Sequence, residues 1–300
     1  MPILPKICLW SDLHLEFQDT YPVWKNPGAD ILILSGDIIV AEHLYRNPTA
    51  GLEPIIQNGW YAKDAIRYRR FFDHVSNEFP IVLMVMGNHE GYGGRWERTE
   101  SIIREEFARY DNMFLLEQDR MVINDVVYLG ASLWTSLDKG DPVVVTSIKD
   151  MMNDYKQITQ VTNGNYHKLS PYTTMSKHNE TVRWLKKELA ADERTTVVIG
   201  HHTPSYKSIH PRYINQTIMN HAFSSDLSEL MLDNPHIKLW TGGHVHHSHR
   251  YYIGDTLITI NPHGYPGEVT GFDPNRVIDL NNMPDKDTVG NDYYWTMNKN

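Results

Sequence analysis

Five short polar clusters follow apolar runs in this 300-residue chain, and their positions constrain its fold more than any other feature. The clusters are Asp12-Leu13-His14, Gly36-Asp37, Gly87-Asn88-His89-Glu90, His201-His202 and Gly243-His244-Val245-His246. Parallel strands end at one edge of a sheet, so side chains that directly follow such strands lie close together. Carboxylate, amide and imidazole groups gathered in this way are typical metal ligands. The distribution therefore predicts one shared metal site at a sheet edge.

Short apolar runs before three of the clusters are typical of buried parallel strands. Residues 6–10, 30–35 and 80–86 are rich in Ile, Leu and Val, and each run stops at Ser, Gly or Asn. Between and after these runs, apolar residues recur at helical spacing in residues 64–79 and 95–110. This spacing predicts crossover helices that pack on the sheet.

The rest of the chain adds further strands and helices. Short polar turns separate three apolar runs and predict an antiparallel arrangement of residues 113–116, 120–123 and 126–131. Ser170 and Pro171 predict the start of a helix, because serine is a good N-cap and proline suits the first helical position. A buried strand is expected directly before His201. The last expected elements are a helix near residues 226–232 and strands at 195–200, 237–241, 249–253 and 257–260.

These elements predict a mixed α/β fold in which two sheets have helices on their outer faces. We expect a single domain over residues 1–270 and a loosely packed polar tail over residues 271–300, where apolar periodicity ends. Two stretches near residues 39–60 and 135–169 do not fit the alternation of strands and helices. Long insertions of this kind form lids or binding walls, or else disordered surface loops.

Composition narrows the class of protein. With 41% hydrophobic and 22% charged residues the chain is typical of globular proteins, and its net charge of −9 argues against stable binding to nucleic acid. The single Cys8 excludes an intrachain disulfide and a thiolate metal cluster. The N-terminus lacks the apolar region of a signal peptide, and no segment has the apolar length of a membrane span. We therefore expect a soluble, cytoplasmic protein.

Each cluster taken alone is a weak signal. Asp12 and His14 can face one ion, and the two oxygens of Asp37 can bridge two ions, but a lone Gly-Asp is more often a turn. Taken alone, Asn88 favours a helix cap or an Asx-turn. His244 and His246 project to one side because they alternate at a strand end. The metal-site signal becomes specific because all five clusters occur together and in one order. Three isolated histidines are expected to have no role: His210, His221 and His236.

As a set, the clusters resemble the calcineurin-like metallophosphoesterase superfamily. The family pattern is Asp-x-His, Gly-Asp, Gly-Asn-His-Asp/Glu, a strand-end His and Gly-His-x-His, and the resemblance covers residues 6–265. It implies a four-layer αββα fold, in which a β-sandwich of two sheets lies between helices. It also implies two divalent ions with a bridging hydroxide that attacks phosphorus. The ligands would be Asp12, His14 and His246 for the first metal, Asn88, His201 and His244 for the second, and Asp37 as the bridge.

The same resemblance implies roles for residues that do not bind metal. His89 would act on the leaving oxygen as a catalytic residue beside the bridging Asp37. His201 fits the strand-end position better than His202, because it is the first residue after the apolar run at 197–200, but a shift by one residue to His202 stays open. His202, His263 and Tyr265 are candidate substrate contacts, although the turn at residues 261–266 also fits a purely structural role. Asp154 and Tyr155 are expected in a solvated loop.

The function implied by the resemblance is hydrolysis of a phosphoester. We expect a phosphodiesterase that acts on a nucleotide or another small phosphodiester. A phosphomonoesterase or a protein phosphatase would use the same core, and a non-catalytic scaffold is the alternative outside enzymes. The oxygen and nitrogen ligands suit Mn, Fe, Zn, Co or Ni, and the expected partner is a small phosphoester rather than a nucleic acid or a membrane. The sequence predicts no oligomeric state.

Overall fold

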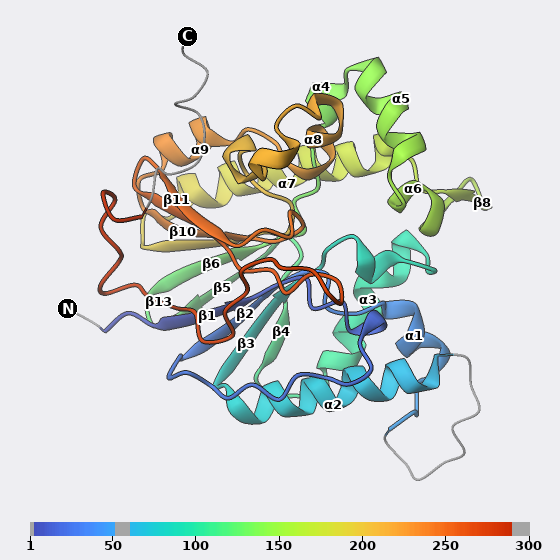
Figure 1. The fold of residues 1–300 in the computed structure, drawn as a ribbon, viewed down its shortest axis with the longest axis horizontal. Coiled ribbons are helices and arrows are strands. Elements are labelled where there is room, and N and C mark those ends of the chain that lie inside the picture. The colour runs from blue at the N-terminus through green and yellow to red at the C-terminus, as the bar shows by residue number, and fades with distance from the viewer. Residues whose placement is uncertain (1–2, 52–60, 290–300) are drawn as a thin grey trace.

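Two mixed β-sheets form the centre of the fold (Figure 1). The computed structural model describes residues 3–51 and 61–289. The first sheet has the strand order β13-β1-β2-β3-β4, with β1 Lys6–Trp10, β2 Ile31–Ser35, β3 Ile81–Val85, β4 Met113–Leu115 and β13 Val277–Asp279. The second has the order β11-β12-β10-β9-β6-β5, with β5 Asp119–Ile123, β6 Val126–Gly130, β9 Thr196–Ile199, β10 Ile237–Gly242, β11 His249–Ile253 and β12 Thr256–Ile260.

The two sheets pack face to face because their strands are apolar on both sides. In β1, Ile7 and Leu9 point between the sheets, whereas Cys8 and Trp10 point toward the helices on the outer face. All four side chains are fully buried. Such two-sided burial is expected of parallel strands inside a layered fold.

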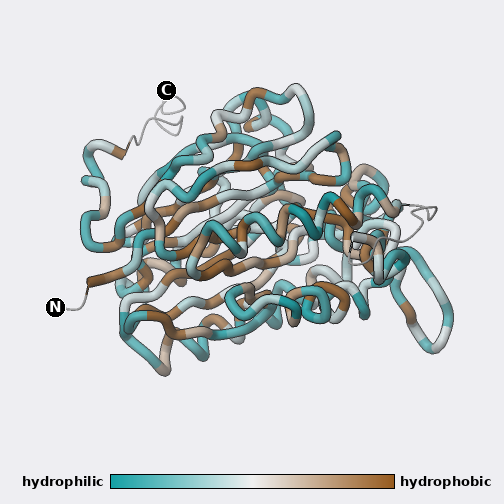
Figure 2. Tube along the Cα trace, turned by 90° about the horizontal axis from the view of Figure 1, so that it is seen from below, coloured by the Kyte–Doolittle hydropathy of each residue, from teal (hydrophilic) through white to brown (hydrophobic). Residues whose placement is uncertain are grey.

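Helices cover the outer face of each sheet. The first sheet is covered by α1 Ala41–Arg46, α2 Ala62–Glu78 and α3 Trp96–Phe107, and the second by α7 Pro171–Ala191 and α9 Ser228–Asp233, while α8 Thr217–Phe223 packs on the segment that precedes α7 (Figure 1). Hydrophobic segments run through the interior of the chain trace, and hydrophilic segments lie mainly outside (Figure 2). The expected four-layer arrangement of two sheets between helices is confirmed.

The neighbouring inner strands of both sheets run parallel. Strands β1 to β4 are parallel to one another, as are β6, β9, β10 and β12, while β5, β11 and β13 are antiparallel edge strands. The carboxyl ends of β1, β2, β3, β9 and β10 therefore meet at one edge of the sandwich. The polar clusters follow these five strands, so the topology gathers them.

One strand prediction was wrong. Residues 113–115 were expected in an antiparallel set with the two strands that follow, but β4 pairs in parallel with β3 in the first sheet. Only β5 and β6 form the antiparallel hairpin, and they belong to the second sheet. The chain passes from the first sheet to the second within residues 116–118. This connection is as short as a hairpin turn, so the spacing of the apolar runs does not show that the sheets differ.

The two stretches that broke the alternation contain regular structure. Residues 41–46 of the first form α1, and residues 52–60 lie outside the described part of the chain. The second holds α4 Leu137–Gly140, α5 Pro142–Met151, α6 Asp154–Gln157 and the hairpin of β7 Thr159–Thr162 and β8 Asn165–Lys168. Asp141 caps α5 by accepting hydrogen bonds from the backbone N–H groups of Val143 and Val144. The segment therefore has regular structure, and its apolar residues around Ile148 form a cluster with Trp134 and Ala222 from outside it.

The segment after residue 271 is not a loose tail over its described part. Strand β13 pairs with β1, and Leu280 and Val289 are buried against the core between the sheets. Burial of these side chains attaches the segment, although its apolar residues have no periodicity. The domain boundary near residue 270 stays a prediction, and residues 290–300 lie outside the described chain. Among the described residues, no helix combines the length and apolarity that crossing a membrane requires.

Candidate metal centre

The backbone of the polar clusters is held in an unusual conformation. Asp12, His14, Asp37, His244 and His246 have φ angles of 53°, 44°, 55°, 66° and 43°, in the left-handed region that residues other than glycine rarely adopt. This conformation carries a cost of order 1–3 kcal/mol per residue, and it persists only where surrounding structure imposes it. Backbone hydrogen bonds between the clusters supply that constraint, with Asp12 N donating to Gly36 O and His14 N to Asp37 O, both at 3.0 Å.

Two glycines provide the space in which the clusters meet. A Cβ atom at Gly243 would lie 2.6 Å from Asp12 Oδ2, and one at Gly36 would lie 2.5 Å from His201 Nδ1. Gly36 also has a φ of +80°. Side chains at either position would therefore displace a predicted ligand.

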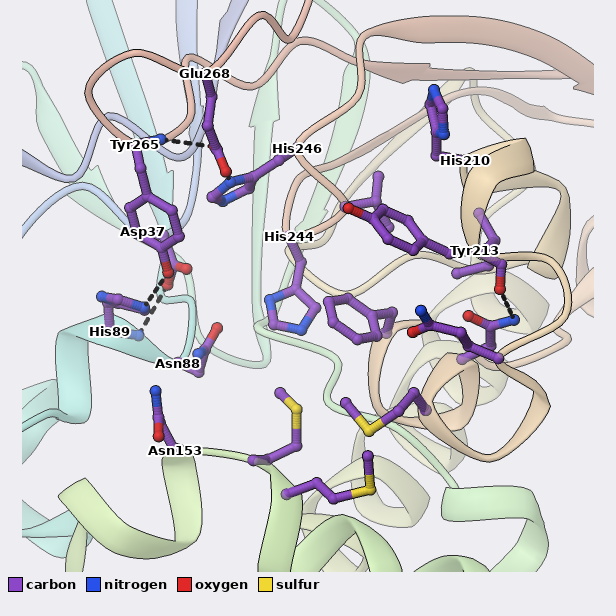
Figure 3. A pocket seen from close by; sticks show the side chains of 18 of the residues that line it. Asp37, Asn88, His89, Asn153, His210, Tyr213, His244, His246, Tyr265 and Glu268 are labelled. Carbon is purple, nitrogen blue, oxygen red and sulfur yellow. Dashed lines mark hydrogen bonds and ion pairs between the residues drawn. The ribbon is translucent and has the colours of Figure 1, made fainter.

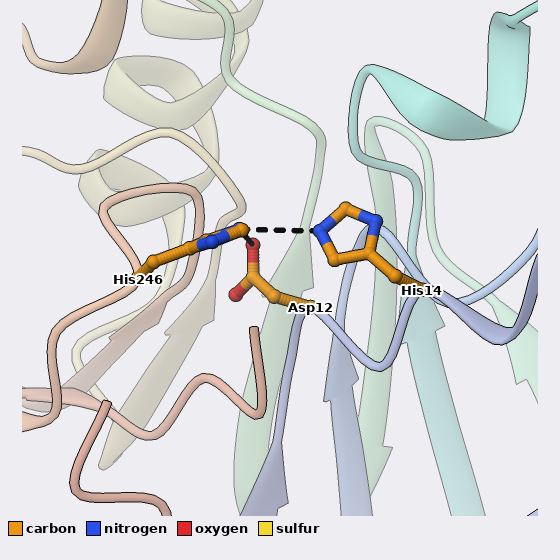
Figure 4. Close-up of side chains that lie close together, drawn as sticks. All are labelled: Asp12, His14 and His246. Atoms are coloured by element: carbon orange, nitrogen blue, oxygen red, sulfur yellow. Dashed lines mark hydrogen bonds and ion pairs between the residues drawn. The ribbon is translucent and has the colours of Figure 1, made fainter. Parts of the chain in front are cut away.

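The first group of candidate ligands consists of Asp12, His14 and His246 (Figure 4). His246 Nε2 lies 3.1 Å from His14 Nε2 and 3.4 Å from Asp12 Oδ1. Asp12 Oδ2 is buried and has no hydrogen-bond partner. Such a cluster of facing acceptors is favourable only when a proton or a cation lies among them.

The second group consists of Asp37, His201 and His244, with Asn88 beside it. His201 Nε2 lies 3.4 Å from Asp37 Oδ2 and 3.2 Å from Asn88 Oδ1. His244 Nε2 is buried without a partner. Burial, together with the neighbouring His202 and His201, lowers the pKa of His244 well below its usual value, so that its lone pair is available to a cation. The structure thus brings together all seven predicted ligands.

Three of the histidines are oriented in the way that metal ligands usually are. Nδ1 of His14 donates to Glu16 Oε1 at 3.2 Å, Nδ1 of His201 to Ser35 O at 2.8 Å, and Nδ1 of His246 to Glu268 Oε2 at 2.7 Å. Each ring then turns Nε2 toward the centre. A metal-bound histidine typically donates its other N–H to an oxygen in this way. Together with the unpartnered atoms of Asp12 and His244, this geometry fits divalent first-row metal ions.

His89 lies beside both groups and forms a third group with His14 and Asp37 whose ligand atoms are close enough to share a cation. Its Nδ1 donates to Glu16 Oε1 at 2.8 Å, and its Nε2 faces Tyr265 Oη at 3.2 Å. Burial alone would lower the pKa of His89, but the carboxylates of Asp37 and Glu16 outweigh it and raise the pKa to about 8. His89 is thus held where it can carry a proton at the pocket surface. Glu16, which fixes both His89 and His14, was missed by the sequence analysis, although it continues the alternation of Asp12 and His14.

Asp154 is part of the centre and not of a solvated loop, which corrects the expectation for this residue. Its Oδ1 accepts hydrogen bonds from Asn88 Nδ2 and from the Tyr92 hydroxyl, each at 2.7 Å. The Asp154 side chain is buried, and Tyr155 is buried in the apolar cluster of the insertion. By holding the Asn88 amide nitrogen, Asp154 turns the Asn88 carbonyl oxygen toward His201.

Glu90 fixes the loops that carry the centre. Its carboxylate oxygens accept hydrogen bonds from the backbone N–H groups of Gly87, Asp37 and Ile38, with N–O distances of 2.6, 3.0 and 2.8 Å. These hydrogen bonds connect the loop after β3 to the loop after β2. The sequence pattern contained Glu90 but gave it no role.

The structure separates the three candidate substrate contacts. Tyr265 lines the pocket beside the centre, and its role as a substrate contact stays a prediction. His202 does not line this pocket: it donates Nδ1 to Ser132 O at 3.2 Å and stacks on Trp134, and burial lowers its pKa to about 3. Of the two adjacent histidines, His201 and not His202 therefore lies with the predicted ligands Asp37 and His244. His263 lies in a different cleft against Trp24, so its expected role as a contact is not supported by its position.

The pocket beside the centre has a volume of about 330 Å³ (Figure 3). Asp37, His89 and His246 line one side, and Tyr213 and His210 line the other. His210 was expected to have no role, but it forms part of this wall. Its position depends on the segment between β9 and α8, which local sequence does not place.

Comparison with known proteins agrees with this arrangement. The family model for calcineurin-like phosphoesterases matches residues 5–248. An uncharacterized protein of Acanthamoeba polyphaga mimivirus is 25% identical over 297 residues, which cover 91% of this chain and 96% of the viral protein. The solved structure of phosphopantetheinyl hydrolase from Mycobacterium tuberculosis has a TM-score of 0.58 at 16% identity and covers 89% of this chain and 92% of that one. Because the family match includes every residue of both ligand groups, we conclude that the chain belongs to the calcineurin-like phosphoesterase family and is a phosphoester hydrolase.

Proposed function

We propose that the protein is a dinuclear phosphodiesterase that acts on small phosphodiesters. The observation that carries this proposal is the position of Asp37 between the two ligand groups. Asp37 Oδ2 lies 3.9 Å from His14 Nε2 in the first group and 3.4 Å from His201 Nε2 in the second. A carboxylate in this position can be shared by two cations, with Asp12, His14 and His246 completing one site and Asn88, His201 and His244 the other.

Asp37 and His89 would have different roles in the hydrolysis of the phosphodiester. The chemistry supplied by two bound divalent ions is activation of a water molecule and compensation of charge on the phosphoryl oxygens. Burial alone would raise the pKa of Asp37, but the imidazoles of His201 and His89 hold it well below its usual value, so the carboxylate is ionised. His89 is oriented by Glu16 and presents Nε2 toward the pocket. It can therefore donate a proton to the oxygen of the departing group.

The charge of the pocket favours a diester over a monoester. A monoester carries a second negative charge, for which arginine is the usual side-chain partner. Among the described residues that line the pocket, none is a lysine or an arginine. A diester carries a single negative charge and has a second organic group, for which the side of the pocket away from the metal groups provides room.

A comparison of two chromogenic esters tests the proposal. Hydrolysis of bis(p-nitrophenyl) phosphate and of p-nitrophenyl phosphate would be measured side by side with added Mn²⁺, with Asp37→Asn protein as the control. We expect faster turnover of the diester and none in the control. Faster turnover of the monoester would identify a phosphatase instead. Activity on neither ester, despite bound metal, would contradict the proposal for simple diesters.

A further inference from the structure

The pocket is built from two unlike halves. The centre half holds the charged and imidazole side chains of the metal groups, with Tyr265 and Glu268 beside them. The distal half, as we name it, consists of Met151, Met152 and Asn153 at the end of α5 and of lining residues between 209 and 223. Figure 3 shows Tyr213 and His210 on the side of the pocket opposite Asp37 and His89.

The distal half exposes apolar side chains that a folded protein usually covers. Met151 is 54% exposed and Tyr213 is 42% exposed, although both line the pocket. Phe223 and Met219 lie deeper on the same side and are partly buried. An apolar surface next to a reactive centre is typical of a site that buries part of a ligand. Methionine adapts to the shape of its ligand and contacts aromatic rings favourably.

The distal half contains amides, the His210 imidazole and the Tyr213 hydroxyl, and its described lining residues include no lysine or arginine. Asn153 and Gln216 are exposed at the pocket surface, and each can donate and accept hydrogen bonds. The carboxylates that line the pocket, Asp37 and Glu268, belong to the centre half. A further phosphate in the distal half would therefore find no lysine or arginine among the described lining residues, and it would lose its hydration beside apolar and amide side chains.

The distal half is attached firmly to the centre. Asp154 directly follows Asn153, and its hydrogen bond to Asn88 joins the end of α5 to a predicted metal ligand. On the opposite side, Thr203 N donates to Phe223 O at 3.1 Å, which connects the loop after β9 to α8. The pocket is thus formed before a ligand binds, and its chemistry can select among ligands.

We propose that the distal half binds an uncharged, nucleoside-sized organic group that is esterified to the phosphate at the metal centre, and that it rejects groups carrying additional phosphates. A volume of about 330 Å³ has room for one such group, because small-molecule sites span roughly 300–1,000 Å³. Hydrolysis of such an ester rests on the proposed phosphodiesterase function, whereas binding of the organic group by the distal half does not.

Two esters that differ by one phosphate test the inference. The p-nitrophenyl ester of thymidine 5′-monophosphate would be compared with the same ester carrying a 3′-phosphate. Chromatography of all products detects cleavage on either side of the phosphorus atom. We expect kcat/KM to be about tenfold or more higher for the ester without the 3′-phosphate, because a charged group is costly to desolvate beside amide and apolar side chains.

A charge placed in the pocket provides the matched variant. Gln216 is exposed and lines the pocket, so Gln216→Lys adds a cation to the distal half without disturbing the core. This variant should reduce the preference to about threefold or less. Ile218 is 37% exposed and does not line the pocket, so Ile218→Lys adds the same charge outside it and should leave the preference unchanged.

Calorimetry would measure the affinity of both esters for His89→Ala protein, in which hydrolysis is slow. Comparison of these affinities with kcat/KM of the wild-type protein separates this inference from the proposed function. Equal kcat/KM and equal affinity for the two esters would overturn the inference and leave a phosphodiesterase. Absence of hydrolysis of these esters and of bis(p-nitrophenyl) phosphate, with a preserved preference in binding, would overturn the proposed function and support the pocket chemistry. Absence of both hydrolysis and binding would overturn both proposals.

Discussion

The centre half and the distal half of the pocket differ in what fixes their geometry. The centre is buried and polar, and it is held by strand ends, by left-handed backbone at positions such as Asp12, and by carboxylates that orient each ring. The distal half is apolar and partly exposed, and it is carried by short helices outside the two sheets. A centre of this kind tolerates few substitutions, because its ligand and orienting groups are buried and joined by hydrogen bonds such as those that Glu16 accepts from His14 and His89. Substitutions in the distal half can leave the geometry of the centre intact. Such a separation is expected when related enzymes use one reaction on different substrates.

Asp37→Asn should break the centre most completely. The substitution removes the charge shared by both ligand groups, since Asp37 Oδ2 lies within 3.9 Å of His14 Nε2 and 3.4 Å of His201 Nε2. We expect metal affinity to fall by about a hundredfold or more and metal-dependent turnover to reach background. Metal analysis of the dialysed protein and a diesterase assay measure the two effects. Full metal content in the variant would show that Asp37 does not bridge.

His89→Ala should separate catalysis from metal binding within the centre. His89 donates to Glu16 and faces Tyr265, and it stands outside the proposed ligand set. We expect turnover to fall by about a hundredfold while metal content stays at the wild-type level. The Asp37→Asn protein is the comparison that does lose metal. Release of metal from His89→Ala protein would mean that His89 is a ligand.

The same division explains how much the sequence could predict. Asp12, Asp37, Asn88 and His244 each follow an apolar run directly, so a local pattern places them at one sheet edge. Asp154 has no such pattern, because its partner Asn88 is 66 residues away and its position depends on how the insertion folds.

Helix α5 and strand β13 were missed for related reasons. Three successive valines favour a strand, but the cap at Asp141 and Pro142 at the first position start a helix whose apolar residues pack within the insertion. Strand β13 has only three residues, and its formation depends on the free edge of β1. Long-range contacts decide both elements, and a single sequence does not display them.

Asp154→Ala should show that the insertion also supports the centre. Loss of the carboxylate leaves the Asn88 amide and the Tyr92 hydroxyl without their shared acceptor, so the Asn88 carbonyl is no longer oriented. We expect affinity for Mn²⁺ at one of the two sites to fall by about tenfold. Asp154→Asn keeps an acceptor oxygen and should retain more of the affinity, as calorimetric titration of metal-free protein would reveal. Equal affinities in wild-type and Asp154→Ala protein would show that the contact does not position Asn88.

Met151→Ala should produce the smallest effect and should affect only the distal half. The Met151 side chain is about half exposed at the pocket surface, so its truncation removes part of the apolar contact with the ester group and leaves the centre intact. For the thymidine ester we expect KM to rise by roughly two- to fivefold, with metal content and kcat for bis(p-nitrophenyl) phosphate close to wild type. Val143 lies on the same helix, is 63% exposed and is outside the pocket lining, so Val143→Ala is the control. If both variants raised KM equally, the effect would come from the stability of α5, and Met151 would not contact the substrate.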